Sequence, residues 1–510
     1  MAGLLVLVAA EFVLRRTWNG DASIYLPYAR STAAGDPFSF NPSEFSSGST
    51  SPLWAVLLAI PVGLSSALGA LKAFFALFSA VAYAVTFGAA ASIGRSWLGA
   101  AIGSSLLVTT LTRPAAVGFE SSLVVALVAA SLWLGARLAE RDRLSRRALL
   151  PLVVVWAALP LARPEAALLV MIELVALCLV RRHARREVIT LFACACLAAL
   201  PAIAYFGYSI LDLGVVSTST AGRSAWLREH GNRLGPLYVS DFAIRYLFTS
   251  PVVYAFVPGI AGLLLLARER ATRFAAGYAL AGVAAYLLLL TFVSPGFLDT
   301  GRYLLPISPF VVLGIAALAR ALAEQRVALA AAVLLGGLLI VRPAVQVLVD
   351  DAPAIRDTPY TFDNNLERGA ADVLNREAAP GSTVLAYEVQ VRWFLRPDLR
   401  VLSLDGITDG KVLPYSRRND LRGFLLHYRP RYWVADPTAD PPEPGADRPG
   451  YITNSPLGRA MSALSADRSR RVVEEDGIRF TVLARRARPL PYPFGPWTAV
   501  LELSYPGAPR

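Results

Sequence analysis

Histidine and cysteine are scarce in this chain of 510 residues, which contains three of each. The three histidines are far apart in sequence, which argues against a metal site built from histidines. The cysteines, Cys178, Cys194 and Cys196, all lie within apolar runs, so the sequence indicates neither a disulfide framework nor a zinc knuckle. No cofactor is assigned from the sequence. A divalent cation stays open, and it would need carboxylate ligands.

Charge is also scarce. Charged residues make up 17% of the chain, against roughly 25% in soluble domains, while 55% is hydrophobic and the mean hydropathy is +0.49. Long uncharged runs, such as Ala148 to Ala162 and Phe274 to Val293, alternate with short polar or arginine-rich linkers, a pattern typical of helices that cross a bilayer. The net charge of +12 sits in these linkers, so topology explains it and we expect no nucleic-acid partner. The sequence predicts a polytopic α-helical membrane protein.

The basic clusters predict which helix ends face the cytoplasm. They are Arg95, Arg141 to Arg147, Arg181 to Arg186, Arg268 to Arg273, and Arg320 to Arg326. Between one basic cluster and the next, the chain must cross the membrane outward and come back. Each such segment should therefore form two spans joined by a turn or loop outside the cell. For Ala148 to Val180 the outer turn is then Arg163-Pro164-Glu165. The same reasoning places Asp212 to Asp241 and Ser294 to Arg302 in outer loops.

The first part of the chain follows the same rule. If the first helix starts in the cytoplasm, residues 15–51 form an outer loop. The apolar stretch Pro52 to Leu68 cannot then be a full span, because one more crossing would invert every basic linker, and we expect a juxtamembrane or partly inserted helix. With Val327 to Val341 as the last crossing, residues 1–345 form a transmembrane domain of about eleven spans in the plasma membrane.

Residues 346–510 are richer in proline, arginine and aspartate, and this tail is long enough for a domain of its own. A helix is expected near Asn364 to Glu377. Short apolar runs bounded by turn residues predict strands at Thr383 to Tyr387, Arg400 to Leu404, Arg431 to Val434, and Phe480 to Leu483. We therefore expect an extracytoplasmic α/β domain.

Asp21 is the first candidate for chemistry, because it places an ionisable group at the membrane surface soon after the first span. At the centre of a membrane helix an aspartate costs about 2.5 to 3.5 kcal/mol on insertion scales, so it should be functional or lie shallow. The alternative is that Asp21 only caps a short interfacial helix.

The surrounding loop resembles the first extracytoplasmic loop of the glycosyltransferase C superfamily, in the bacterial branch that includes terminal arabinofuranosyltransferases and mannosyltransferase-like proteins. The matching positions are Asp21-Ala22, Ile24, Tyr28-Ala29-Arg30, Gly35, Phe40-Asn41-Pro42, Glu44, and Ser51-Pro52-Leu53-Trp54. Three further elements match in the family's order: Gly118 to Leu123, Ala162 to Ala166, and Gly301 to Pro306. The resemblance covers roughly residues 15–315 and the tail more loosely.

Two departures from the family's pattern stand out. Gly20-Asp21 replaces the usual pair of acids, so only the second acid is kept. After the seventh expected span, the stretch Thr218 to Arg223 lacks the family's lysine and offers Arg223 one position later. If the missing acid is the essential base, this protein could be impaired as an enzyme, or it could act on a different donor or acceptor.

The resemblance implies an inverting glycosyltransferase. Such an enzyme would move a pentose such as arabinofuranose, or a hexose such as mannose, from a polyprenyl-phosphate donor to a glycan, lipid or protein acceptor of the cell envelope. The transfer needs a carboxylate base for the acceptor hydroxyl and cations for the leaving phosphate. No soluble nucleotide-sugar fold is required, and the sequence has no clear glycine-rich nucleotide loop.

The candidate residues take their roles from this chemistry. Asp21 is the candidate base. The candidate phosphate contacts are arginines, whose guanidinium groups match phosphate oxygens; they are Arg163, Arg223 and Arg302. The candidates that orient sugar hydroxyls or hold these arginines are Glu44, Glu120 and Glu165, and Tyr303 is a further substrate contact.

Each assignment has a plainer alternative. Arg163 and Glu165 can simply pair at a hairpin tip, Arg302 and Tyr303 can be interfacial anchors, and Glu120 can favour a helix N-terminus. At the level of the protein, the alternatives are a transporter or flippase of lipid-linked saccharides and a non-catalytic scaffold derived from the enzyme. A transporter should carry its polar residues in mid-bilayer and show repeated halves, whereas here they gather at outer helix ends.

Overall fold

The computed structural model of the protein describes residues 2–13, 22, 24–65, 68–116, 118–219, 221, 251–293, 302–323, 325–345, 366–387, 389–418, 420–435, 456–467, 469–487 and 497–506. The chain divides into two compact units. The first comprises Met1–Thr17, Ser65–Tyr205 and Leu234–Arg356, and the second comprises Trp18–Leu64, Phe206–Arg233 and Asp357–Arg510. The units interleave along the chain, whereas the predicted domains are contiguous, and the predicted boundary at residue 345 stays a prediction.

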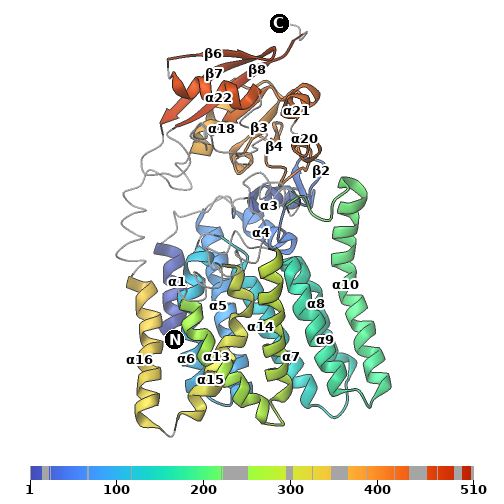
Figure 1. Ribbon diagram of the computed structural model, residues 1–510, viewed down its shortest axis with the longest axis vertical. Helices are drawn as coiled ribbons and strands as arrows, with labels where there is room; N and C mark the ends of the chain where they lie inside the picture. Colours follow the sequence, from blue (N-terminus) through green and yellow to red (C-terminus); the bar gives the residue numbers. More distant parts are fainter. Residues whose placement is uncertain are drawn as a thin grey trace. The chain divides into compact units, whose positions relative to one another are not determined.

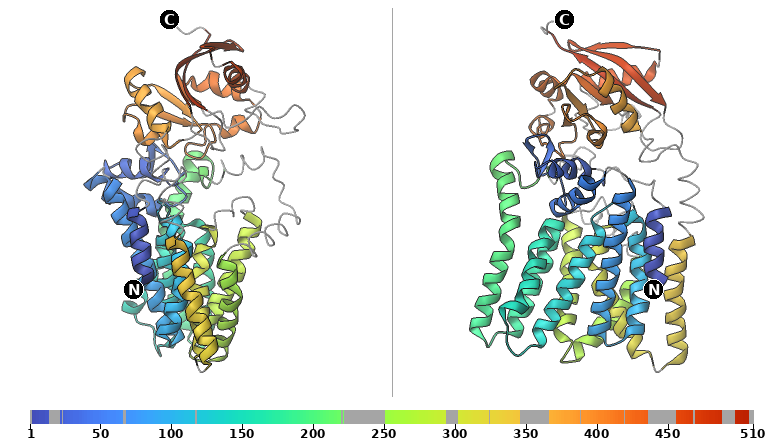
Figure 2. Two further views of the ribbon diagram at one scale, coloured as in Figure 1. Left: turned by 90° about the vertical axis from the view of Figure 1, so that its left-hand side faces the viewer. Right: turned by 180° about the vertical axis from the view of Figure 1, so that it is seen from behind.

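The first unit is helical, and its long helices run side by side in the views of Figures 1 and 2. They are α1 (Ala2–Val13), α5 (Leu68–Gly94), α6 (Trp97–Ala116), α7 (Ser121–Glu140), α8 (Arg146–Ala162), α9 (Ala167–Val180), α10 (Arg185–Leu213), α13 (Pro251–Arg268), α14 (Arg273–Val293), α15 (Ser308–Ala321) and α16 (Arg326–Val345), with short 3-10 turns η1 (Pro164–Ala166) and η3 (Arg302–Ile307). Helix α10 enters the second unit at Phe206.

Within the described residues, five helical stretches are long and apolar enough to cross a membrane. They belong to α5, α7, α10, α14 and the continuous stretch Arg302–Ala321, and shorter apolar helices accompany them. The protein is therefore a multi-pass membrane protein. The number of crossings and the orientation in the membrane stay predictions.

Helix α8 ends at the Arg-Pro-Glu sequence, where the sequence predicts a turn between two helices. Arg163 separates α8 from η1 and has extended backbone dihedrals, φ −156° and ψ 126°. Pro164 follows at the first position of η1, where its missing N–H costs nothing. The predicted helical hairpin with Arg163-Pro164-Glu165 at its turn is confirmed in this geometry.

Glycines bring α13 and α15 into backbone contact. A Cβ atom added at Gly262 or at Gly314 would collide with a backbone carbonyl oxygen of the facing helix. Small residues at a crossing are the usual way for membrane helices to pack closely. This close packing holds α15, the helix that directly follows η3, against α13.

The second unit has a six-stranded mixed sheet in the order β4-β3-β5-β8-β7-β6, with β3 parallel to both its neighbours and the remaining pairs antiparallel. The strands are β3 (Thr383–Ala386), β4 (Arg400–Ser403), β5 (Tyr432–Ala435), β6 (Val472–Glu475), β7 (Ile478–Ala487) and β8 (Trp497–Ser504). The helices of this part are α18 (Leu366–Glu377), α19 (Val391–Phe394), α20 (Leu413–Ser416), α21 (Leu421–Tyr428) and α22 (Pro456–Ala466). The predicted mixed α/β character of the tail is confirmed.

Helices cover both faces of this sheet. Trp433 packs in a core with residues of α21 and α22, such as Phe424 and Leu464. The adjacent Tyr432 points to the opposite face, because side chains alternate along a strand, and its hydroxyl reaches the carbonyl of Glu377 in α18 at 3.5 Å.

Further elements of the second unit come from the first loop and from the stretch that directly follows it. They are α3 (Tyr25–Ala33), the short hairpin of β1 (Ser39–Asn41) and β2 (Glu44–Phe45), and α4 (Pro52–Leu64). Helix α4 is short and apolar, as expected for the stretch that the charge rule excludes as a full span.

Candidate functional site

A buried ion pair joins two of the predicted site residues in the first unit. Arg163 lies at the turn between α8 and η1, and Glu120 directly precedes α7. The Arg163 Nε lies 3.3 Å from the Glu120 Oε1, and the two side chains are 7% and 3% exposed. The ion pair of Arg163 thus reaches a different helix rather than only its neighbour at the hairpin tip.

Aromatic rings complete this cluster. The guanidinium carbon of Arg163 lies 4.7 Å from the ring centroid of Tyr303, and that of Arg302 lies 4.2 Å from the ring of Phe119 and 5.1 Å from Tyr303. The Arg163 Nη1 also donates to the carbonyl of Arg302 at 3.5 Å. The three motif elements that follow the first loop in sequence therefore meet at one place, which we call the arginine cluster: Phe119, Glu120, Arg163, Arg302 and Tyr303.

Two further residues border the arginine cluster. Glu165 and Tyr286 both interact electrostatically with Arg163, and Tyr286 of α14 is fully buried. Sequence reasoning missed Phe119 and Tyr286. Phe119 lies inside a recognised motif and could have been found there, whereas Tyr286 lies in an apolar run that gives no such signal.

The arginine cluster can bind an anion. Stacking on an aromatic ring orients the plane of a guanidinium, and its N–H donors then lie in that plane, in the fork that matches a phosphate. Glu120 compensates the charge of Arg163 in a site that excludes water. The ion pair with Glu120 holds Arg163, and the roles of Glu120 and Glu165 toward a substrate stay predictions.

Glu44 lies in the second unit with both carboxylate oxygens engaged. Its Oε2 is 2.9 Å from the Arg400 Nη2, and its Oε1 pairs with the Lys411 Nζ. Burial alone would raise the pKa of Glu44, but the hydrogen bonds from Lys411 and Arg400 outweigh it and hold the pKa below its usual value. The structure gives Glu44 a tethering contact, and its contact with a sugar stays a prediction.

Asp21 and Arg223 lie outside the described residues. The loop that follows Asp21 contains Ser47, a residue of the second unit. Its Oγ accepts a hydrogen bond from the backbone N–H of Thr218 at 3.0 Å, and its carbonyl accepts one from the Ser217 hydroxyl at 3.0 Å. The loop that follows Asp21 and the segment that precedes Arg223 are therefore held together.

Within the described residues, no group of three or more histidine, cysteine, aspartate or glutamate side chains is arranged to hold a metal ion. The divalent cation left open by the sequence stays open.

No protein-family model matches the chain, and no curated protein matches it in sequence. Solved structures do match. ArnT from Cupriavidus metallidurans, crystallised with undecaprenyl phosphate, superposes with a TM-score of 0.54 at 13% identity, covering 85% of this chain and 92% of that one. The Archaeoglobus fulgidus oligosaccharyltransferase in its apo form gives a TM-score of 0.53 at 13% identity, over 85% and 69%.

The oligosaccharyltransferase AglB from Archaeoglobus fulgidus, in complex with an inhibitory peptide and a dolichol-phosphate, gives a TM-score of 0.52 at 12% identity, over 85% of this chain and 69% of that one. Identities this low establish the fold and nothing finer. The chain therefore shares the fold of ArnT and of this oligosaccharyltransferase.

Proposed function

We propose that the protein is an inverting glycosyltransferase that takes its sugar from a polyprenyl-phosphate donor. The observation that carries the proposal is the arginine cluster, in which Arg163 and Arg302 are held by aromatic rings and by Glu120. The fold adds support, because ArnT and AglB were solved with undecaprenyl phosphate and with a dolichol-phosphate.

In this reaction the acceptor hydroxyl attacks the anomeric carbon while Asp21 takes its proton. The bond between that carbon and the phosphate oxygen breaks, and the phosphate leaves with an added negative charge. Arg163, Arg302 and Arg223 stabilise this charge, since charge-assisted hydrogen bonds from guanidinium groups are strongest where charge develops. Glu120 and Glu165 orient Arg163, and Tyr303 positions both arginines.

The donor sugar is a pentose such as arabinofuranose or a hexose such as mannose, and the acceptor is a glycan, lipid or protein of the cell envelope. The charge rule supports an arrangement with the active site and the C-terminal domain on the extracytoplasmic side of the plasma membrane. A polyprenyl tail can then lie between helices while its phosphate sits at the interface.

The experiment is reconstitution of the full chain with a panel of polyprenyl-phosphate pentoses and hexoses and an acceptor extract, comparing wild type with Asp21→Asn. Wild type should transfer from at least one donor, and Asp21→Asn should lose about 10²- to 10⁴-fold of the rate, the usual contribution of a general base. If folded wild type transfers from no donor, the enzyme assignment fails.

Gly20 favours a second candidate, because it stands where the family usually keeps an acid. A non-catalytic scaffold derived from the enzyme would leave cellular glycans unchanged in an Asp21→Asn strain but change them when the whole chain is deleted.

A further inference from the structure

The edge strand β4 of the six-stranded sheet is covered by the first loop. The Asn41 Nδ2 donates to the Val401 carbonyl at 2.9 Å, and the Asn41 Oδ1 accepts from the Val401 N–H at 2.8 Å. One side-chain amide thus supplies the donor and the acceptor that a neighbouring strand would supply. Asn41 is 2% exposed, so both bonds are shielded from water.

Charges reinforce this contact on either side of β4. Arg400 begins the strand, Lys411 lies shortly beyond its end, and both pair with Glu44. The Asn41 Nδ2 also donates to the Glu44 Oε2 at 3.0 Å, so the amide and the carboxylate act as one hydrogen-bonded group. A carboxylate that is held by two cations and an amide has little freedom to bind a substrate.

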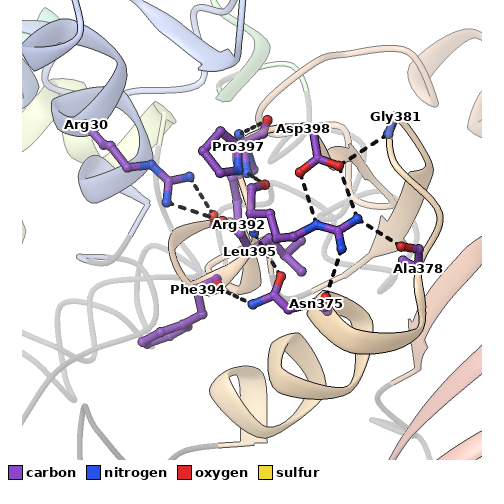
Figure 3. Close-up of polar contacts among 10 residues, drawn as sticks. Arg30, Asn375, Ala378, Gly381, Arg392, Phe394, Leu395, Pro397 and Asp398 are labelled. Carbon is purple, nitrogen blue, oxygen red and sulfur yellow. Dashed lines mark hydrogen bonds and ion pairs between the residues drawn. The ribbon is translucent and has the colours of Figure 1, made fainter.

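Arg30 makes a second contact between the first loop and the tail. Its Nη2 donates to the Arg392 carbonyl at 2.9 Å, and its Nη1 donates to the Leu395 carbonyl at 3.4 Å (Figure 3). Its Nη1 also donates to the Trp393 carbonyl at 2.8 Å. The Arg30 guanidinium carbon also lies 5.5 Å from the Trp393 ring centroid. Arg30 therefore binds the carbonyls at the C-terminal end of α19, where a cation is favoured.

The segment that receives Arg30 is itself fixed. The Asn375 side chain of α18 donates to the Phe394 carbonyl at 3.0 Å and accepts from the Arg396 N–H at 2.9 Å. Arg396 in turn binds the Ala378 carbonyl at 2.9 Å and the Asp398 carboxylate at 3.1 Å (Figure 3). Arg30 is thus anchored to a rigid part of the domain.

Gly48 shows how closely the loop and the tail approach each other. A Cβ atom at Gly48 would lie 2.5 Å from the Ile407 carbonyl oxygen and 2.6 Å from the Thr408 Cα, so only glycine fits at this position. The Ser46 hydroxyl, two residues earlier, donates to the Thr408 carbonyl.

We propose that Arg30, Asn41 and Glu44 are positioning residues, through which the C-terminal domain holds the loop that carries the catalytic base. The inference rests on the proposed function of Asp21. These three residues belong to the recognised loop motif, and their contacts give each of them a task other than binding substrate. Because Ser47 of the same loop binds Ser217 and Thr218, the domain also positions the segment that leads to Arg223.

The test uses the full chain in nanodiscs with three variants, Asn41→Ala, Glu44→Gln and Arg30→Lys. The matched control is Arg459→Gln, which breaks two ion pairs of the same unit, with Glu475 and with Asp476, neither of which involves the loop. Three quantities are measured: amide hydrogen exchange of residues 25–51, kcat for transfer, and the donor KM.

Asn41→Ala and Glu44→Gln should speed exchange in residues 39–51, and Arg30→Lys should speed it in residues 25–33. All three should lower kcat by about 10- to 100-fold, the effect of a misplaced catalytic group, with the donor KM within about twofold. Lys411→Glu should lower kcat at least as far as Glu44→Gln, because it replaces one of the two cations that hold Glu44 with a like charge. Arg459→Gln should change none of these three quantities.

The inference is overturned if the variants keep wild-type kcat, if kcat falls without faster exchange in the loop, or if Arg459→Gln has the same effects. These results differ from a failure of the proposed function, in which folded wild type itself transfers from no donor.

Discussion

The two units hold their arginines in different ways. In the first, Arg163 and Arg302 lie against the rings of Tyr303 and Phe119, and one carboxylate, Glu120, is paired with Arg163. In the second, Arg30 binds backbone carbonyls. In the first unit a ring orients each guanidinium, and Arg163 donates to the Arg302 carbonyl while Arg302 donates to the Tyr303 hydroxyl. Arg30 also lies over a ring, that of Trp393, but its Nη atoms donate to three backbone carbonyls. The first arrangement suits binding of an anion, and the second suits holding two chain segments together.

Arg163→Gln gives the largest expected effect and tests the first arrangement. It removes a phosphate contact and leaves Glu120 buried without its cation, so transfer should fall by about 10²- to 10³-fold and stability by about 3 to 5 kcal/mol. Thermal unfolding and transfer rate measure the two effects.

Adding Glu120→Gln to this variant separates them. The double variant should recover most of the unfolding temperature, because no buried charge is left unpaired, but not the rate. Recovery of both would assign Arg163 a structural role alone.

A pH titration tests the contact around β4. Burial raises the pKa of Asp405 and Asp409 to about 6, above the ordinary 3.8. The folded state therefore binds more protons than the unfolded state between these values, so stability should rise as pH falls from about 7 to about 4, by about 2 to 3 kcal/mol per group at most.

Asp409→Asn should flatten this pH dependence of the unfolding temperature. Asp467→Asn is the control, because Asp467 is exposed and its pKa is lowered by Ser469. If Asp409→Asn leaves the slope unchanged, Asp409 does not titrate in this range.

Gly48→Ala tests the close approach of the loop to residues 407 and 408. Its Cβ must displace backbone, at a cost of about 1 to 3 kcal/mol, visible as a lower unfolding temperature and faster exchange in residues 39–51. Gly63→Ala in α4 is the control, since its Cβ would meet only Ala33 at 3.5 Å. Equal behaviour of the two variants would contradict the tight contact.

Arg431→Gln should have the smallest effect. Its ion pair with Glu502 joins an exposed side chain to a partly exposed one at 3.1 Å, and surface pairs contribute about 0 to 1 kcal/mol. An unfolding temperature well below that of wild type would contradict the small contribution expected of this surface pair.

Local features of the fold could be predicted from the sequence, and long-range pairings could not. The turn at Arg163 follows from basic clusters and a proline, and β3, β4, β5 and part of β7 follow from short apolar runs. The position of β8 between β5 and β7 depends on pairings across the domain that no local pattern encodes.

The same limit applies to the site. The rule that basic clusters face the cytoplasm predicts Glu120, Arg163 and Arg302 on the same side of the membrane. It does not predict whether Glu120 or Glu165 forms the ion pair with Arg163. Asn41 and Arg30 bind residues about 360 positions away in the chain, so their partners could not be read from the loop. The motif marked these residues without showing what they contact.

The most direct measurement is the affinity of the full chain, in nanodiscs, for undecaprenyl phosphate and for undecaprenol, in wild type and in Arg302→Gln. Wild type should bind the phosphate more tightly than the alcohol, and Arg302→Gln should weaken only the phosphate, by about tenfold or more, as expected for a lost charge-assisted contact. Equal affinity of wild type for the two lipids would contradict a phosphate site at the arginine cluster.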